Sequence, residues 1–297
     1  MRWRIRFDPW NALALILAFS PALHAGDADL NLAEQQYQRA DYSGAIHTLL
    51  SYEPKTARAN ALLGKSYYME GQYKSSTTYL EKAVAQDGSS SSDYDWLGKA
   101  YGRRAEQSSL ITALPLAIKT RKSFERAVAL DSTSLEALGD LFEYYLQAPA
   151  VVGGGSAKAE AVAARIAQLS EPESHYVQAR LAEKRGDNVE AEQEYRKAME
   201  AAPHDVGRVV DLATFLSDHR RFQESDNLFN VAGQIEPSSP KVMFARAASY
   251  IHSGRNLPEA KTMLQHYLAL PHTPDDPAGP DVAQLTQGFG NSLAPLK

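Results

Sequence analysis

The chain has 297 residues, of which 44% are hydrophobic and 23% charged, so it has enough apolar sequence to bury a core. Its net charge of −5 argues against a nucleic-acid-binding protein, since such proteins present a basic surface. The sequence contains no cysteine, which excludes disulfide bonds, thiolate metal sites and a lipid-modified N-terminal cysteine.

Residues 1–25 have the pattern of a secretory signal peptide. Three arginines among the first six residues precede a short apolar run at residues 12–19, and Ala25 is the expected cleavage point. Cleavage after Ala22 is the alternative, because Leu23 stands where a smaller residue is usual. The run is too short to span a bilayer, although an uncleaved anchor or a buried first helix would use similar residues. We expect an exported protein, periplasmic or secreted.

A small residue recurs about every 34 residues through the rest of the chain. The positions are Gly64, Gly98, Gly139, Ala179, Ala213 and Ala247. A large residue follows most of them three positions later, at Tyr67, Tyr101, Phe142, Leu216 and Tyr250. Such a period is typical of helix–turn–helix solenoids, in which small residues let paired helices approach closely. The pattern therefore predicts a binding surface built from stacked repeats and argues against a classical enzyme pocket.

Seven predicted units cover residues 28–57, 58–90, 92–131, 133–171, 172–204, 206–238 and 240–271. The third and fourth units are longer than the others. We expect about ten extra residues, RRAEQSSLIT and its surroundings, to separate the helices of the third unit, and residues 148–155 to separate those of the fourth. The three glycines before Ser156 predict a flexible turn with Ser156 as the N-cap, because no P-loop lysine follows them.

Residues 272–297 form a tail rich in proline, glycine and aspartate. The composition predicts a loop, with a short helix near residues 281–287 that would cap the last apolar face of the array. The tail is long enough to reach the groove of the array, but no residue pattern demands that it does.

The repeat pattern resembles that of tetratricopeptide-repeat (TPR) proteins. The best matches are Leu63, Gly64, Tyr67, Gly71, Tyr73, Leu80 and Ala83 in the second unit, and Trp96, Leu97, Gly98 and Tyr101 in the third. The enlarged third and fourth units are similar to those of a group of exported bacterial TPR proteins. The resemblance implies an all-α, right-handed superhelical solenoid of about seven repeats over residues 26–271, with a concave groove for peptides or partner helices.

The groove-facing positions of the TPR pattern lie one residue after the small residue and about one helical turn to either side. In this chain they include Arg58, Lys65, Tyr68, Lys99, Arg103, Asp140, Tyr144, Tyr176 and Arg180. The basic residues would attract carboxylates, and the tyrosines would supply rigid contact area. The alternative is a solvated face with ordinary charges. The asparagines of the TPR clamp for a C-terminal carboxylate are missing, so that activity is not transferred.

No motif for catalysis or metal binding stands out. The eight histidines are scattered, and HExxH, GxSxG and a cysteine nucleophile are all missing from the sequence. We expect no metal and no cofactor, and a non-enzymatic adaptor for a protein or peptide, without a nucleic-acid partner or a membrane span after signal cleavage. The alternatives are a structural subunit of an envelope assembly or export complex, and a small-ligand or catalytic protein that uses the enlarged units.

Overall fold

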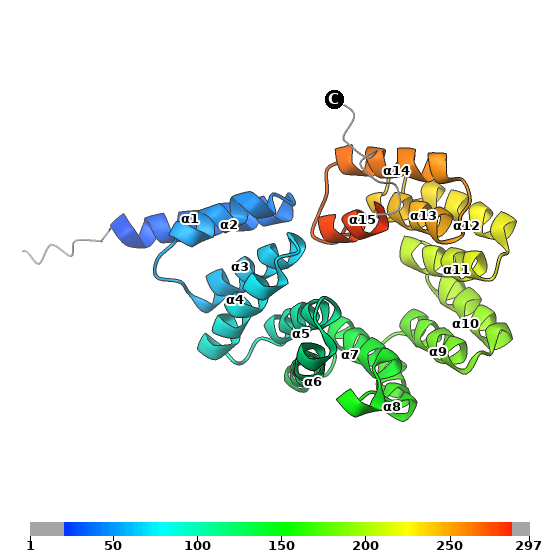
Figure 1. The fold of residues 1–297 in the computed structure, drawn as a ribbon, viewed down its shortest axis with the longest axis horizontal. Helices are drawn as coiled ribbons and strands as arrows, with labels where there is room; N and C mark the ends of the chain where they lie inside the picture. Colours follow the sequence, from blue (N-terminus) through cyan, green and yellow to red (C-terminus); the bar gives the residue numbers. More distant parts are fainter. Residues whose placement is uncertain (1–20, 287–297) are drawn as a thin grey trace, which may run out of the picture.

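The protein is all-α. The computed structural model describes residues 21–286, with side chains from residue 28 onward, and these residues form fifteen α-helices, one short 3-10 helix and no strand (Figure 1). Within this part of the chain, no helix combines the length and the apolar character that crossing a membrane requires. The predicted signal peptide falls mostly outside the described residues.

Seven antiparallel helix pairs follow one another along the chain. The first helices, called A helices, are α1 (Pro21–Gln38), α3 (Ala57–Met69), α5 (Ser91–Glu106), α7 (Leu135–Gln147), α9 (Glu171–Arg185), α11 (Val206–Asp218) and α13 (Pro240–His252). The second helices, called B helices, are α2 (Tyr42–Ser51), α4 (Tyr73–Gln86), α6 (Leu110–Leu130), α8 (Ser156–Ile166), α10 (Asn188–Ala201), α12 (Phe222–Ile235) and α14 (Leu257–Ala269). The 3-10 helix η1 (Ala150–Val152) precedes α8, and α15 (Gly279–Thr286) follows the last pair.

Side-chain N-caps fix where many A helices begin. The capping residues, whose side chains accept a hydrogen bond from a backbone N–H in the first turn, are Thr56, Ser90, Ser134, Ser170 and Asp205. A cap of this kind typically stabilises a helix by about 1 kcal/mol. The caps recur at nearly the repeat period, so the local sequence sets the same start in successive units.

Two of the recurring glycines are required by close helix packing. A Cβ at Gly64 would lie 2.4 Å from Leu80 Cγ, and a Cβ at Gly98 would lie 2.5 Å from the Phe124 ring. In these two repeats the B helix therefore packs directly on the backbone of its A helix. A Cβ at Gly139 would meet no atom within 4 Å, so helix packing does not require a glycine at this position.

The third repeat is enlarged in its helices and not in its loop, which corrects the expectation. Helices α5 and α6 have 16 and 21 residues, and only residues 107–109 connect them. The first turn of α6 therefore projects into solvent, with Leu110 85% and Ile111 88% exposed.

The fourth repeat carries its extra residues in a loop. Helix α8 begins at Ser156, and its N-cap is Gly155 at φ 148, so Ser156 is the first helical residue and not the cap. A Cβ at Gly154 would lie 1.8 Å from the Ala148 carbonyl oxygen, so only glycine fits there. The glycine turn thus folds tightly onto the end of α7.

The two ends of the array meet through residues 271–286, here called the strap. Ala278 of the strap is buried in the core cluster of the first two repeats, and Val282 is buried in the core cluster of the seventh repeat. The strap carries α15, which lies between the first and last repeats (Figure 1). The superhelix is therefore closed into a ring.

Candidate functional site

A ladder of ion pairs connects successive A helices across the concave face. Its rungs, here called the ladder, are Arg58–Glu34 (2.6 Å), Lys65–Asp93 (3.8 Å), Lys99–Glu136 (2.6 Å), Arg180–Glu143 (3.0 Å) and Arg208–Glu173 (3.3 Å). Each rung joins an A helix to the A helix of the next repeat. Many groove charges are thus already used to join neighbouring repeats.

The Lys99 rung is the most crowded part of the ladder. Besides Glu136, the Lys99 ammonium lies 2.9 Å from Asp95 Oδ2 and 3.1 Å from Asp140 Oδ2. Burial alone would lower the pKa of Lys99, but the carboxylates of Asp140 and Asp95 outweigh burial and raise it. Burial, reinforced by the nearby Asp140 carboxylate, raises the pKa of Asp95 to about 7. Three carboxylates around one ammonium leave an excess of negative charge, so the cluster holds a proton readily.

The same three carboxylates form the group among the described residues whose spacing could hold a metal ion. Their oxygens converge as the ligands of a hard cation would. The Lys99 ammonium contacts Asp95, Glu136 and Asp140, so it already supplies the positive charge that a cation would bring. We therefore assign the cluster a structural role.

Arg103 differs from the ladder cations in where its partner lies. Its Nη2 donates to Asp281 Oδ1 of the strap at 2.7 Å, and its Nε donates to the Tyr73 hydroxyl at 3.1 Å. Glu106, on the same helix, accepts a further hydrogen bond. Asp281 also accepts from the Ala278 N–H at 3.3 Å, which fixes its carboxylate at the start of α15.

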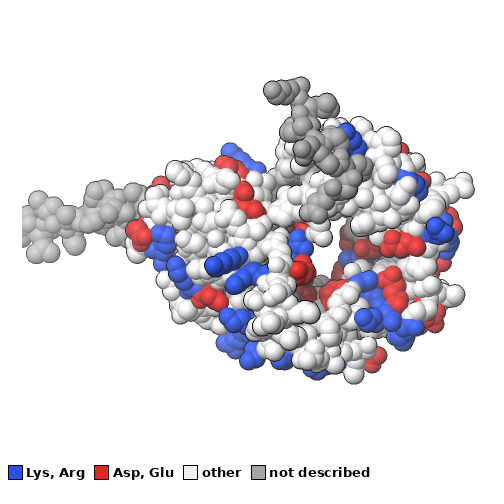
Figure 2. Space-filling model, in the orientation of Figure 1, with Lys and Arg blue, Asp and Glu red and all other residues white. Residues whose placement is uncertain are grey.

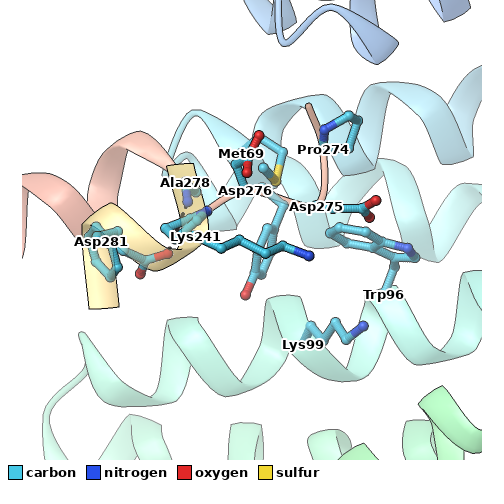
Figure 3. Close-up of a pocket in the computed structure, with 12 residues that line it drawn as sticks. Met69, Trp96, Lys99, Lys241, Pro274, Asp275, Asp276, Ala278 and Asp281 are labelled. Atoms are coloured by element: carbon cyan, nitrogen blue, oxygen red, sulfur yellow. Dashed lines mark hydrogen bonds between the residues drawn. The ribbon is translucent and has the colours of Figure 1, made fainter. Parts of the chain in front are cut away.

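A cavity of about 460 Å³ lies where the strap crosses the groove. Helices α3, α5 and α13 contribute Tyr68, Met69, Trp96, Lys99, Lys241 and Phe244, and the strap contributes Asp275, Asp276, Pro277, Ala278 and Asp281. Figure 3 shows Lys99 and Lys241 extending toward the same space beside Trp96, with strap residues bordering it. The cavity combines aromatic walls, two ammonium groups and a border that belongs to a segment outside the repeats.

Aromatic contacts position the cavity walls. The rings of Tyr68 and Trp96 meet edge to face with centroids 5.3 Å apart, and Lys99 Nζ lies 5.0 Å from the Trp96 centroid. Burial raises the pKa of Tyr68 to about 12, so its hydroxyl stays protonated at neutral pH and remains a hydrogen-bond donor. Lys241 makes no ion pair with another residue of the described range 28–286. Its ammonium is available to a ligand.

The structure brings only some of the predicted groove residues together. Tyr68 and Lys99 line the cavity, and Arg103 holds the strap segment that borders it. Arg58 and Lys65 line a separate cavity of about 360 Å³ near the first repeat. Along the groove, charges of opposite sign from successive A helices pair with each other.

Tyr144 corrects the predicted groove. Its ring packs against Phe124 with centroids 6.4 Å apart. Its hydroxyl lies 2.8 Å from the Ala117 carbonyl oxygen and 3.0 Å from that of Val152, so it points to the fourth-repeat loop. The helical spacing fails here because the enlarged α6 and η1 surround this side of α7.

Tyr176 and Arg180 lie farther along the ring. Arg208 stacks over Tyr176 with 4.4 Å between the guanidinium carbon and the ring centroid. Arg180 donates two hydrogen bonds of 3.0 Å to Glu143 and a third of 2.9 Å to Glu183. Both predicted residues therefore contact side chains of neighbouring A helices.

Four of the cavity residues on the A helices fall outside the nine predicted site residues: Met69, Trp96, Lys241 and Phe244. The helical spacing places Met69 and Phe244 on the groove face, and Lys241 lies three positions before Phe244 on α13, so the same spacing could have found it. The strap carboxylates carry no such signal, because no periodic pattern extends into the tail.

Charged side chains are unevenly distributed over the surface of the ring. In Figure 2, Lys and Arg gather over α3–α6, and acidic side chains border the hollow in the middle of the ring. The region from Tyr101 to Leu130 contains six basic and two acidic residues, although the whole chain is acidic.

Comparison with known proteins agrees with the repeat architecture. No protein-family model and no curated protein matches the chain. A solved thermophilic TPR protein from Thermus thermophilus is 22% identical, covers 64% of this chain and 98% of its own, and has a TM-score of 0.52. A TPR protein from Parabacteroides merdae is 12% identical, with 88% and 97% covered and a TM-score of 0.58. The chain has a tetratricopeptide-repeat fold.

A further structural likeness lies outside bacteria. The human IFIT1 dimer with PPP-AAAA is 17% identical, covers 82% of this chain and 55% of its own, and has a TM-score of 0.54. At these identities the likenesses concern the TPR fold and not its ligand. The ring closure and the cavity under the strap are therefore interpreted from this chain's own residues.

Proposed function

We propose that this protein is an interaction adaptor that binds a segment of a partner protein where the strap crosses the TPR groove. The cavity beside Trp96 carries the proposal, since it joins aromatic walls to Lys241, which forms no ion pair with residues 28–286. An extended segment with a carboxylate and an apolar side chain fits these groups, because a cation and rigid rings are typical anchors at interfaces. The mechanism is equilibrium binding without a chemical step.

We also propose that the adaptor is exported and acts in the periplasm or outside the cell. The basic and apolar pattern before Ala25 supports this location. A fusion of residues 1–30 to a reporter that is active only after export tests it. Reporter activity that persists when the arginines of the leader are kept but the apolar run is replaced by polar residues would contradict the proposal.

In-cell crosslinking tests the adaptor role. The tagged protein is crosslinked in the envelope fraction, and the captured proteins are identified by mass spectrometry. Lys241→Glu should abolish capture of the main partner, whereas Lys122→Glu, an equal charge change on the exposed face of α6, should leave it unchanged. Equal capture by both variants with unchanged circular dichroism would remove the cavity as the binding site.

A structural subunit of an envelope assembly is the second proposal. The exposed first turn of α6, with Leu110 and Ile111 largely in solvent, offers contact surface and no enclosed pocket, which favours assembly over small-ligand chemistry in the enlarged repeats. A subunit should co-fractionate quantitatively with a membrane complex. An adaptor should be recovered partly free.

A further inference from the structure

The strap is made of residues that match the groove surface it crosses. Its first eleven residues, PHTPDDPAGPD, contain four prolines and three aspartates, and residues 271–286 contain no lysine or arginine. The facing repeats present cations and aromatic rings: Arg103, Lys99, Lys241, Tyr68, Trp96 and Phe244. Proline-containing segments characteristically dock on aromatic-lined grooves, because proline loses little conformational entropy on binding.

Polar contacts hold the strap in one conformation. Asp276 accepts hydrogen bonds from the Thr273 N–H at 2.7 Å and from its hydroxyl at 3.1 Å, which forms a tight turn. The Tyr267 hydroxyl donates to the Pro277 carbonyl oxygen at 2.5 Å. The Tyr42 hydroxyl reaches the Thr273 carbonyl oxygen at 3.5 Å from the first repeat. Hydrogen bonds from both ends of the array therefore converge on the strap.

The strap packs closely against the turn between α3 and α4. Gly71 has φ 72, and a Cβ there would lie 2.7 Å from Pro280 Cγ. Pro280 thus packs on the bare backbone of the turn between α3 and α4. This close contact lies one residue from Asp281, whose carboxylate pairs with Arg103.

We propose that the strap is the resident occupant of the groove and shows what the partner looks like: an acidic, proline-containing segment that must displace it. This inference rests on the proposed adaptor function and names its ligand class. The strap remains tethered, so it competes at an effective concentration on the order of millimolar. A partner segment therefore needs either higher intrinsic affinity or a released strap.

The test uses a synthetic, fluorophore-labelled peptide of residues 271–286 and the full chain. In the release variant, Asp281→Lys removes the ion pair to Arg103, and Ala278→Arg places a charge where the strap is buried. Both changes lie in the strap, so the receiving surface is intact. Glu160→Lys, on the exposed face of α8, is the control for the charge reversal at Asp281.

Fluorescence anisotropy should show the peptide binding the release variant at least about tenfold more tightly than the wild type or Glu160→Lys. A peptide carrying Asp281→Lys should lose about two- to fivefold in affinity for the release variant, because it lacks the carboxylate for the partly exposed Arg103. Equal binding of the peptide to wild type and release variant, or no binding to either, would overturn the proposal.

A distance measurement keeps the proposal testable if the release variant folds poorly. The natural chain has no cysteine, so Glu70→Cys and Ala283→Cys carry the only spin labels, and both positions line one cavity of about 490 Å³. A saturating amount of the free peptide should lengthen the label distance. An unchanged distance at saturation would show that the peptide does not displace the strap.

The two proposals fail in different ways. One outcome is a cellular partner whose capture depends on Lys241 but is not competed by the strap peptide. This result would support the adaptor function and contradict the proposal that the strap occupies the partner's site. A strap peptide that binds the release variant, with no Lys241-dependent partner, would confirm the peptide site and remove the adaptor function.

Discussion

The groove charges of the middle repeats and those at the closed end of the ring differ in where their partners lie. Arg180 in the middle donates two hydrogen bonds to Glu143 on the preceding A helix. Arg103 at the closed end donates to Asp281 on the strap, 178 residues away in sequence. Opening the first pair means separating two repeats, whereas opening the second means moving one segment. A charged groove residue therefore indicates binding only when its partner can be replaced.

The ion pairs also differ in how deeply their side chains are buried. The side chains of Lys99 and Asp95 are 20% and 3% exposed, whereas those of Arg103 and Asp281 are 24% and 41% exposed. An ion pair that keeps one partner in water gains little stability, and its loss costs little. Removing one partner from a buried group leaves an uncompensated charge and costs much more. The buried Lys99–Asp95 pair therefore supports the fold, and the strap contact supports exchange.

The largest effect is expected for Lys99→Glu. It places a fourth carboxylate beside Asp95, Glu136 and Asp140 and should lower the free energy of unfolding by about 3–5 kcal/mol. Urea unfolding followed by circular dichroism measures this change. Lys241→Glu is an equal charge change at a residue that forms no ion pair within the described part of the chain, and it should alter stability by less than about 0.5 kcal/mol. Equal urea midpoints for the two variants would contradict the prediction that the Lys99 ion pairs stabilise the fold more than the Lys241 side chain does.

The next effect concerns pH. The pKa of Asp95 is raised from 3.8 to about 7 by burial and by Asp140. Between these values the folded protein keeps a proton that the unfolded chain has released, so the free energy of unfolding falls as pH rises. We expect the wild type to lose about 2 kcal/mol between about pH 4 and pH 8, after allowance for relaxation around a buried group.

Asp95→Asn should remove most of this slope and should stabilise the protein at high pH. Asp211, whose pKa burial raises to about 6, contributes a slope of the same sign that both proteins share. Urea titrations of wild type and variant at several pH values measure the difference. Parallel slopes would show that Asp95 is already ionised throughout this range.

A charge swap at the strap should have a smaller effect. Arg103→Glu and Asp281→Lys should each cost about 0.5–1 kcal/mol, because the pair is partly exposed. The doubly substituted protein should recover part of this loss, which a double-mutant cycle isolates. Amide hydrogen exchange should show faster exchange across residues 272–286 in the single variants. Additive costs in the cycle would mean that the two charges do not interact.

The sequence predicts the repeats because the information is local. The small residues such as Gly98 and the N-caps recur with the period of one repeat, and each acts within its own helix pair. Groove partners depend on the offset between repeats, which the spacing does not encode, so the pattern gives no sign that the Tyr144 hydroxyl bonds to Ala117. The Arg103–Asp281 pair joins segments too distant for any periodic pattern. The site is therefore less predictable than the fold.

The smallest expected effect, that of salt, separates the two regions most directly. Raising ionic strength from about 0.1 M to about 1 M shortens the Debye length from about 10 Å to about 3 Å, which screens exposed pairs much more than buried ones. Spin labels at Glu70→Cys and Ala283→Cys should show the fraction of open strap rising about twofold, while the free energy of unfolding changes by less than about 0.5 kcal/mol.

Asp281→Asn provides the control for this measurement, because it keeps the shape of the side chain and removes its charge. Its open fraction should be higher than that of the wild type at low salt and should respond little to added salt. A wild-type strap that ignores salt would mean that the buried Ala278 and Val282 hold it without help from Arg103. The contacts at the closed end would then stabilise the fold, as those in the middle of the ring do. To release the strap, a competitor would have to replace its apolar contacts and not its carboxylate.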